Sequence, residues 1–207
     1  MPIINTSKFR HQLEETLDPT WNILYLGDGQ PVDLASVVIS SKPFDERLLN
    51  KNSCWGKHCW EQADFSGHLD FILNDSYDFI WVDGLLSWVA NPFNLIRQIE
   101  HSAPAGYISF NSRKTEHVLG IDYPNQCGYM RSGWLIEKLY DDVKQLELVF
   151  TRKTFAVRAF GSIQGIPEER KQILWAENIP CRENVLASPD LIQDAIDFKN
   201  IRSKVIT

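Results

Sequence analysis

The sequence has no excess of positive charge and no long apolar run. Its 21 Lys and Arg residues stand against 27 Asp and Glu residues, which leaves a formal net charge of -6. Such a chain has no general electrostatic attraction to phosphate backbones or anionic membranes. No apolar stretch approaches the roughly 20 residues of a transmembrane helix, and the first residues lack the basic and then apolar pattern of a signal peptide. We therefore expect a cytoplasmic protein that binds neither nucleic acid nor membrane.

Cysteine is scarce as well. The chain has four cysteines in 207 residues and lacks a secretory signal, so reduced thiols are expected rather than disulfides. Cys54, His58 and Cys59 form the densest group of reactive side chains. Their spacing has neither the usual C-x2-C pair of a zinc site nor a second half elsewhere, and a Cys-His nucleophile pair here has no evident orienting partner. No metal site is predicted.

Length and composition favour one ordinary globular domain. Hydrophobic residues make up 43% of the chain and charged residues 23%, which is close to the average of folded proteins. A chain of this length can bury a core without disulfides or metals. We expect a single domain over residues 1–207, with a core at about 20–160 and a C-terminal helical extension at about 165–207.

Short apolar runs alternate with amphipathic stretches in the first half of the chain. This alternation predicts an α/β fold, a Rossmann-like three-layer sandwich with a mostly parallel central sheet. The expected helices cover residues 6–17 and 92–99, and the expected strands cover 21–27, 36–40, 77–82 and 107–110.

Beyond residue 130 the pattern changes to longer strands. Residues 133–140 and 146–151 read as an antiparallel hairpin, and residues 155–160 as a further strand. C-terminal helices are expected at about 167–178 and 188–202, the second because Ser188-Pro189-Asp190 combines a capping residue, a first-turn proline and an acid.

A family resemblance is carried by the run from Tyr77 to Pro92, YDFIWVDGLLSWVANP. It resembles, without a gap, the segment around the fourth strand of class I S-adenosylmethionine-dependent methyltransferases, which reads roughly F-D-x-V-x-x-x-x-V-L-E-H-V-x-D-P. Residues 62–64 are similar to the family's short segment that ends in an acid near the adenine, and residues 94–100 and 106–110 resemble its next helix and fifth strand. The chain resembles the methyltransferase type 11 group of this superfamily, which implies a Rossmann-like fold and S-adenosylmethionine as cofactor.

The same resemblance locates the methyl-donor loop at residues 23–31, in place of the family's [D/E]-x-G-x-G-x-G. Gly27 and Gly29 are retained, whereas Tyr25 stands where the family has an acid and Pro31 where it has a third glycine. The donor motif is therefore degenerate, and Asp28 is the candidate to substitute for the missing acid. The alternative is a plain tight turn between a strand and a helix.

Further donor contacts are implied at the ends of the other strands. Ser40 or Ser41 stands where the family has its ribose-binding acid, Asp64 matches the acid near the adenine, and Phe65 can lie against a purine ring. Asp83 directly follows the fourth strand and would face the donor; capping roles are the alternative for Asp64 and Asp83. The predicted cofactor-binding residues are Gly27, Asp28, Gly29, Ser40, Asp64, Phe65 and Asp83.

The acceptor side offers fewer signals. The family's Glu-His pair after the fourth strand is replaced by Ser87-Trp88. Glu116 and His117 lie in the loop after the fifth strand, at the sheet edge where ligands bind, and they are the candidate catalytic acid-base pair; an ordinary surface loop is the alternative. Trp55 and Trp60 could form an exposed aromatic patch.

Two functions from different classes follow. One is an S-adenosylmethionine-dependent methyltransferase acting on a small-molecule acceptor, for which aligned binding of donor and acceptor can suffice without a general base. The other is a pseudoenzyme, a catalytically inactive methyltransferase-like binding or scaffold protein that need not use the cofactor. A protein partner or a homodimer is possible for either, since the C-terminal region could contact another subunit.

Overall fold

The computed structural model describes residues 6–65, 76–111, 134–140, 146–152 and 170–184. The chain divides into two compact units, residues 1–110 with 171–179 and residues 111–170 with 180–207. A domain can hold more than one such unit, so the single domain over residues 1–207 stays a prediction.

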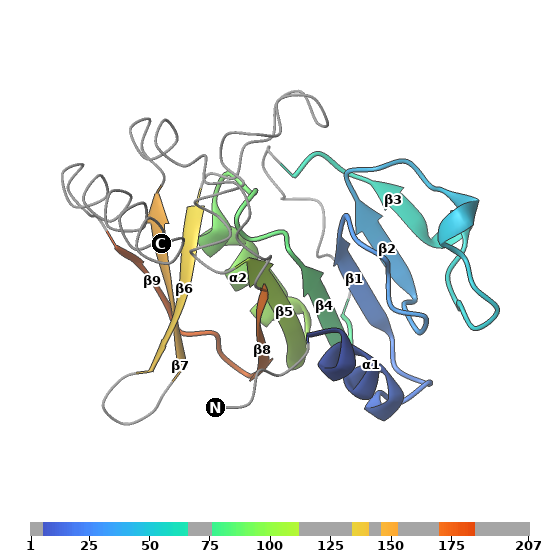
Figure 1. Ribbon diagram of the computed structural model, residues 1–207, viewed down its shortest axis with the longest axis horizontal. Coiled ribbons are helices and arrows are strands. Elements are labelled where there is room, and N and C mark those ends of the chain that lie inside the picture. The colour runs from blue at the N-terminus through green and yellow to red at the C-terminus, as the bar shows by residue number, and fades with distance from the viewer. Residues whose placement is uncertain (1–5, 66–75, 112–133, 141–145, 153–169, 185–207) are drawn as a thin grey trace, which may run out of the picture. The chain divides into compact units, whose positions relative to one another are not determined.

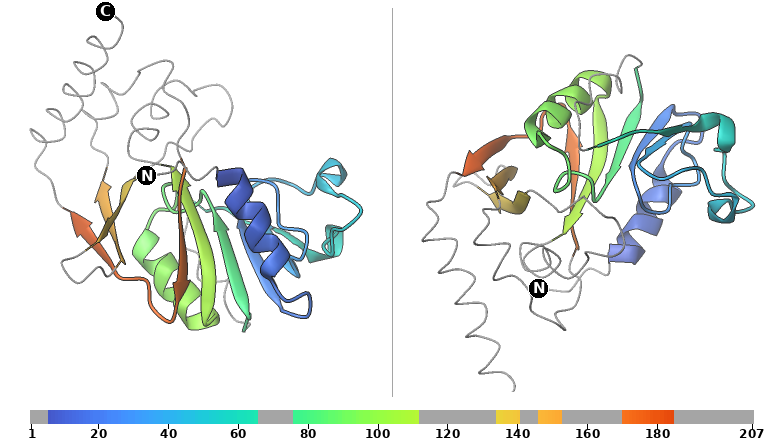
Figure 2. Two further views of the ribbon diagram at one scale, coloured as in Figure 1. Left: turned by 60° about the horizontal axis from the view of Figure 1, so that its bottom comes forward. Right: turned by 90° about the horizontal axis from the view of Figure 1, so that it is seen from above.

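The first unit is built on a six-stranded sheet with the strand order β3-β2-β1-β4-β5-β8 (Figure 1). From β3 to β5 all neighbouring strands are parallel, and β8 runs opposite to β5 (Figure 2). The mostly parallel, Rossmann-like α/β sheet that the sequence predicts is therefore confirmed. Its strands are β1 (Ile23–Gly27), β2 (Val37–Ser40), β3 (Trp60–Gln62), β4 (Phe79–Asp83), β5 (Ala105–Asn111) and β8 (Arg170–Ala176).

Two helices cover opposite faces of this sheet (Figure 2). α1 (Thr6–Thr16) directs Phe9 and Leu13 onto a core cluster that contains Tyr25, Trp81 and Tyr107. α2 (Pro92–Ser102) buries Leu95, Ile96 and Ile99, and its first turn is capped by the Asn91 side chain, which accepts from the Asn94 amide. Among the described residues, no helix combines the length and apolar character needed to cross a membrane.

The central strands form where the sequence is almost wholly apolar. All five residues of β1 and all five of β4 are buried, because helices cover both faces of the sheet. The pairing register joins Leu26 to Val82 and Gly27 to Asp83. The two strands therefore end side by side at the same edge.

β8 corrects one prediction, since residues 170–176 form a strand where a helix was expected at 167–178. The Glu, Arg, Lys, Gln and Leu residues of this stretch are good helix formers. However, Ile173 and Trp175 are buried whereas Leu174 is 49% exposed, and this alternation matches a strand with one covered face. Packing beside β5 outweighs local propensity. The helix expected at 188–202 and the strand expected at 155–160 lie outside the described residues.

The second unit contains a three-stranded sheet. β6 (Trp134–Tyr140) and β7 (Leu146–Arg152) pair antiparallel from Trp134 opposite Arg152 to Tyr140 opposite Leu146, which confirms the predicted hairpin. β9 (Cys181–Asn184) adds a parallel strand beside β7. The sequence gives little sign of β9 because it has only four residues, three of them polar.

The proposed aromatic patch is a second correction. Trp55 is only 2% exposed, and its ring lies 5.8 Å from that of half-buried Trp60, which in turn contacts Phe44. Burial of large aromatic surface in the core explains why these rings turn inward despite their polar neighbours in sequence.

Candidate functional site

The carboxyl edge of the sheet between β1 and β4 is the candidate site. The strand order changes direction here, because β2 and β3 lie to one side of β1 while β4 and β5 lie to the other. Open α/β sheets bind ligands in the crevice at such a switch point. Gly27 ends β1 and Asp83 ends β4 at this point.

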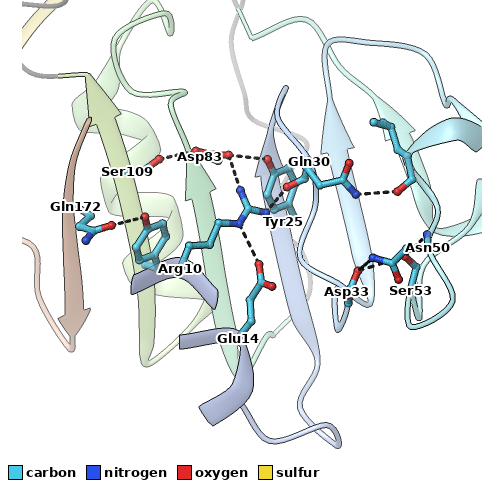
Figure 3. Close-up of polar contacts among 12 residues, drawn as sticks. Arg10, Glu14, Tyr25, Gln30, Asp33, Asn50, Ser53, Asp83, Ser109 and Gln172 are labelled. Carbon is cyan, nitrogen blue, oxygen red and sulfur yellow. Dashed lines mark hydrogen bonds and ion pairs between the residues drawn. The ribbon is translucent and has the colours of Figure 1, made fainter. Parts of the chain in front are cut away.

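A buried polar cluster lies at this edge, centred on the Asp83 carboxylate (Figure 3). Asp83 accepts hydrogen bonds from the Ser109 hydroxyl at 2.5 Å, the Tyr25 hydroxyl at 3.1 Å and the Arg10 guanidinium at 3.2 Å. Three strands and α1 therefore contribute to one cluster. A buried carboxylate is stable only with such partners, so Asp83 organises this part of the edge.

Arg10 carries positive charge to the same cluster, and the sequence reasoning missed it. Its guanidinium donates to Glu14 at 3.0 Å and to the carbonyl of Gln30, and it lies over the Trp81 ring at 5.4 Å from the centroid. Burial lowers the pKa of Arg10, but Tyr25, Glu14 and Asp83 together raise it above its ordinary value, so the group stays charged. The available signal was an arginine next to Phe9, on a helix expected to cover the sheet.

The two glycines of the loop are required by this cluster. Gly27 has a φ of +155°, and a Cβ there would lie 2.6 Å from the Asp83 carbonyl oxygen. A Cβ on Gly29 would lie 2.6 Å from Asp83 Oδ2 and 3.0 Å from the Tyr25 hydroxyl. The loop backbone can approach these groups only because both residues lack side chains.

Asp28 lies between the two glycines but its carboxylate is bound at the end of β2. Asp28 Oδ1 accepts from the Ser40 hydroxyl at 2.8 Å and the Ser41 amide at 2.7 Å, and Oδ2 accepts from the Ser41 hydroxyl at 2.6 Å. The Lys42 ammonium donates to the Asp28 carbonyl at 2.8 Å. Of the predicted site residues, Asp28 and Ser40 are thus in direct contact.

Asp64 and Phe65 follow β3 at the same edge. Asp64 is exposed, whereas Phe65 is only 1% exposed and belongs to the core. The chain is fixed here by the Ala63 amide, which donates to the Ser40 carbonyl at 2.9 Å. Asp64, the Asp28 contact and Asp83 therefore follow one another along an edge three strand spacings wide, roughly 14 Å.

Other candidates are dispersed or lie elsewhere. Glu116 and His117 are outside the described residues. Ser87 is fully buried, and within the described part of the chain its hydroxyl has no hydrogen-bond partner. Cys54 and His58 are exposed, and no group of three His, Cys, Asp or Glu side chains among the described residues could hold a metal ion.

Comparison with known proteins adds a likeness of fold. No protein-family model matches the sequence, and no curated protein does. The chain is similar in fold to S-adenosylmethionine-dependent methyltransferases. One such enzyme, from Mesorhizobium loti, is 21% identical with a TM-score of 0.36. The match covers 53% of this chain and 56% of the Mesorhizobium loti chain, so this chain spans just over half the length of that enzyme. The N-terminal domain of EvdMO1, solved in the presence of SAH and D-fucose, is 13% identical with a TM-score of 0.35, covering 91% of this chain and 71% of that one.

Proposed function

We propose that this protein is an S-adenosylmethionine-dependent methyltransferase that acts on a small molecule, with donor and acceptor at the carboxyl edge of the six-stranded sheet. The observation that carries the proposal is the meeting of the glycine turn with the charged pair Arg10 and Asp83 at the switch point between β1 and β4. A charged nucleoside ligand needs a backbone that it can approach closely, which glycines provide, and charged side chains held in place beside it.

The residues present fit the chemical groups of the donor. Its amino-acid end carries both charges, which Asp83 and Arg10 complement. Its ribose would lie near Asp28 at the end of β2, and its base would lie towards Asp64. Asp83, Asp28 and Asp64 lie along the edge in the strand order β4, β1, β2 and β3. When bound, the cofactor supplies the methyl group, and the chain binds and orients it. Glu116 and His117 remain the proposed acid-base pair.

A second candidate is a binding or scaffold protein that keeps the fold without using the cofactor. This candidate is favoured because the polar groups of the cluster are already hydrogen-bonded to one another: Asp83 accepts from three groups of its own chain, and Arg10 donates to the Gln30 carbonyl. On this reading the two glycines serve packing alone.

The decisive experiment is thermal unfolding of the full chain with and without S-adenosylmethionine or S-adenosylhomocysteine. A ligand at 100 times its dissociation constant adds about 2.7 kcal/mol to the free energy of unfolding, which raises the Tm of a chain of this size by about 5–10 °C. No shift at millimolar cofactor would refute donor binding and leave the scaffold function.

If binding is seen, Asp64→Ala tests the proposed course of the donor along the edge. Loss of a charge-assisted hydrogen bond should weaken binding roughly tenfold or more. Glu61→Ala is the matched control, since it removes an exposed acid from the neighbouring strand β3. Equal affinities of the two variants would contradict the role of Asp64.

A further inference from the structure

The end of β2 has no acid of its own, yet a carboxylate lies there. Ser40 ends β2 and Ser41 follows it, and both bind the side chain of Asp28 from the glycine loop. Resting on the proposed function, we infer that Asp28 accepts a hydrogen bond from one ribose hydroxyl of the donor, in place of an acid on the second strand.

The hydrogen bonds fix the orientation of this carboxylate. Ser40 is only 1% exposed. Its hydroxyl donates its one proton to Asp28 and accepts from the Lys42 amide at 3.1 Å, so two hydrogen bonds hold it in place. The Ser41 amide belongs to the backbone and cannot turn away. Asp28 Oδ1 is thereby held by two donors, and the position of Oδ2 follows from it.

Counting acceptor sites shows what is left for a ligand. Each carboxylate oxygen can accept about two hydrogen bonds. Oδ1 accepts two, from Ser40 and Ser41, whereas Oδ2 accepts one, from the Ser41 hydroxyl. Within the described part of the chain one acceptor site remains, on Oδ2, and Asp28 is partly exposed. The site therefore suits one hydroxyl donor and not both hydroxyls of a diol at once.

Within the described part of the chain, the Asp28 carboxylate forms no salt bridge. The nearby cation, Lys42, donates to the Asp28 carbonyl rather than to its carboxylate. Its donors are two serine hydroxyls and one amide, which orient it. A hydroxyl bound to a charged acceptor gains more than one bound to serine, so Asp28 compensates for the uncharged Ser40.

The test is calorimetric binding of S-adenosylhomocysteine and of its 2′-deoxy and 3′-deoxy analogues to the wild-type chain and to Asp28→Asn. In the wild type, one deoxy analogue should bind about 10- to 100-fold more weakly than the parent and the other should bind like it. Asp28→Asn should weaken the parent by a similar factor and remove the difference between the parent and that analogue. Asp33→Asn is the matched control, because Asp33 is a loop aspartate bound by Asn50 and Ser53 (Figure 3).

The outcomes separate the inference from the proposed function. If the wild type binds S-adenosylhomocysteine but tolerates loss of either hydroxyl, or if Asp28→Asn lowers all three affinities equally, the inference is overturned and donor binding stands. If the wild type does not bind the parent compound, the proposed function fails and the inference fails with it. The comparison of analogues on the wild type needs no variant, so poor folding of Asp28→Asn would not prevent the decision.

Discussion

The Asp83 cluster predicts an asymmetry between its two charged members. The Asp83 side chain is 4% exposed and that of Arg10 is 24% exposed. Asp83→Ala removes the acceptor that the Ser109 and Tyr25 hydroxyls and the Arg10 guanidinium share, and a loss of this kind inside a buried charged cluster costs about 3–5 kcal/mol. Arg10→Met keeps both hydroxyl donors on Asp83, and water can take the place of the partly exposed guanidinium, so about 1–2 kcal/mol is expected.

Urea unfolding of the purified chain, followed by tryptophan fluorescence, measures both changes. With a slope near 2 kcal/mol per molar urea, Asp83→Ala should lower the midpoint by about 1.5–2.5 M and Arg10→Met by about 0.5–1 M. The double variant should cost less than the sum of the two single variants, because the residues share one interaction. Asp78→Ala is the control, an exposed aspartate that accepts from the Asn22 amide at 2.8 Å. A cost of Arg10→Met equal to or above that of Asp83→Ala would refute the view that the cluster is centred on the carboxylate.

Two further predictions test the loop and the surface. Gly27→Ala should destabilise the chain by roughly 2–3 kcal/mol more than Gly84→Ala in the same urea assay. A Cβ on Gly84 meets nothing within 4 Å, so only the φ of +69° opposes it, whereas a Cβ on Gly27 also meets the Asp83 carbonyl. Equal costs would contradict this steric reasoning. Hydrogen bonds from the Thr20 hydroxyl and amide lower the pKa of Asp18, so Thr20→Ala should raise that pKa towards its ordinary value in an NMR titration. The stability that this lowered pKa provides is present above the ordinary pKa and is lost as the pH falls through the lowered one; an unchanged titration would show that the hydroxyl has no part in it.

The sheet could be predicted where one stretch of sequence decides the outcome. β1 is apolar throughout, β4 is apolar up to Asp83, and both are buried on both faces; the first turn of α2 combines an asparagine cap with Pro92. β8 could not be predicted in this way. Its residues favour a helix locally, and they form a strand because β5 offers an edge to pair with, which no local pattern reveals.

The candidate site, like the sheet, could be predicted from the sequence only in part. The glycines are identified through the resemblance to the family's donor loop, and Asp83 through its place at the end of the fourth strand. The partners of these residues are distant in sequence: Arg10 and Asp83 are 73 positions apart and Asp28 and Ser41 are 13 apart. A single sequence gives no sign of such pairs. The predicted role for Asp28 as a substitute for the acid at position 25 therefore overlooked the carboxylate's partners at the end of β2.

The hydrogen bonds within the Asp83 cluster do not by themselves oppose donor binding. A guanidinium has five N–H donors, and Arg10 uses three of them, on Glu14, Asp83 and the Gln30 carbonyl. Within the described part of the chain two donors remain for a ligand carboxylate, so such a ligand could bind without breaking any of these contacts. Stability of the cluster and affinity for the donor are thus separate properties. Arg10→Met should remove affinity at a modest cost in stability if the protein binds the donor, and should alter stability alone if it is a scaffold.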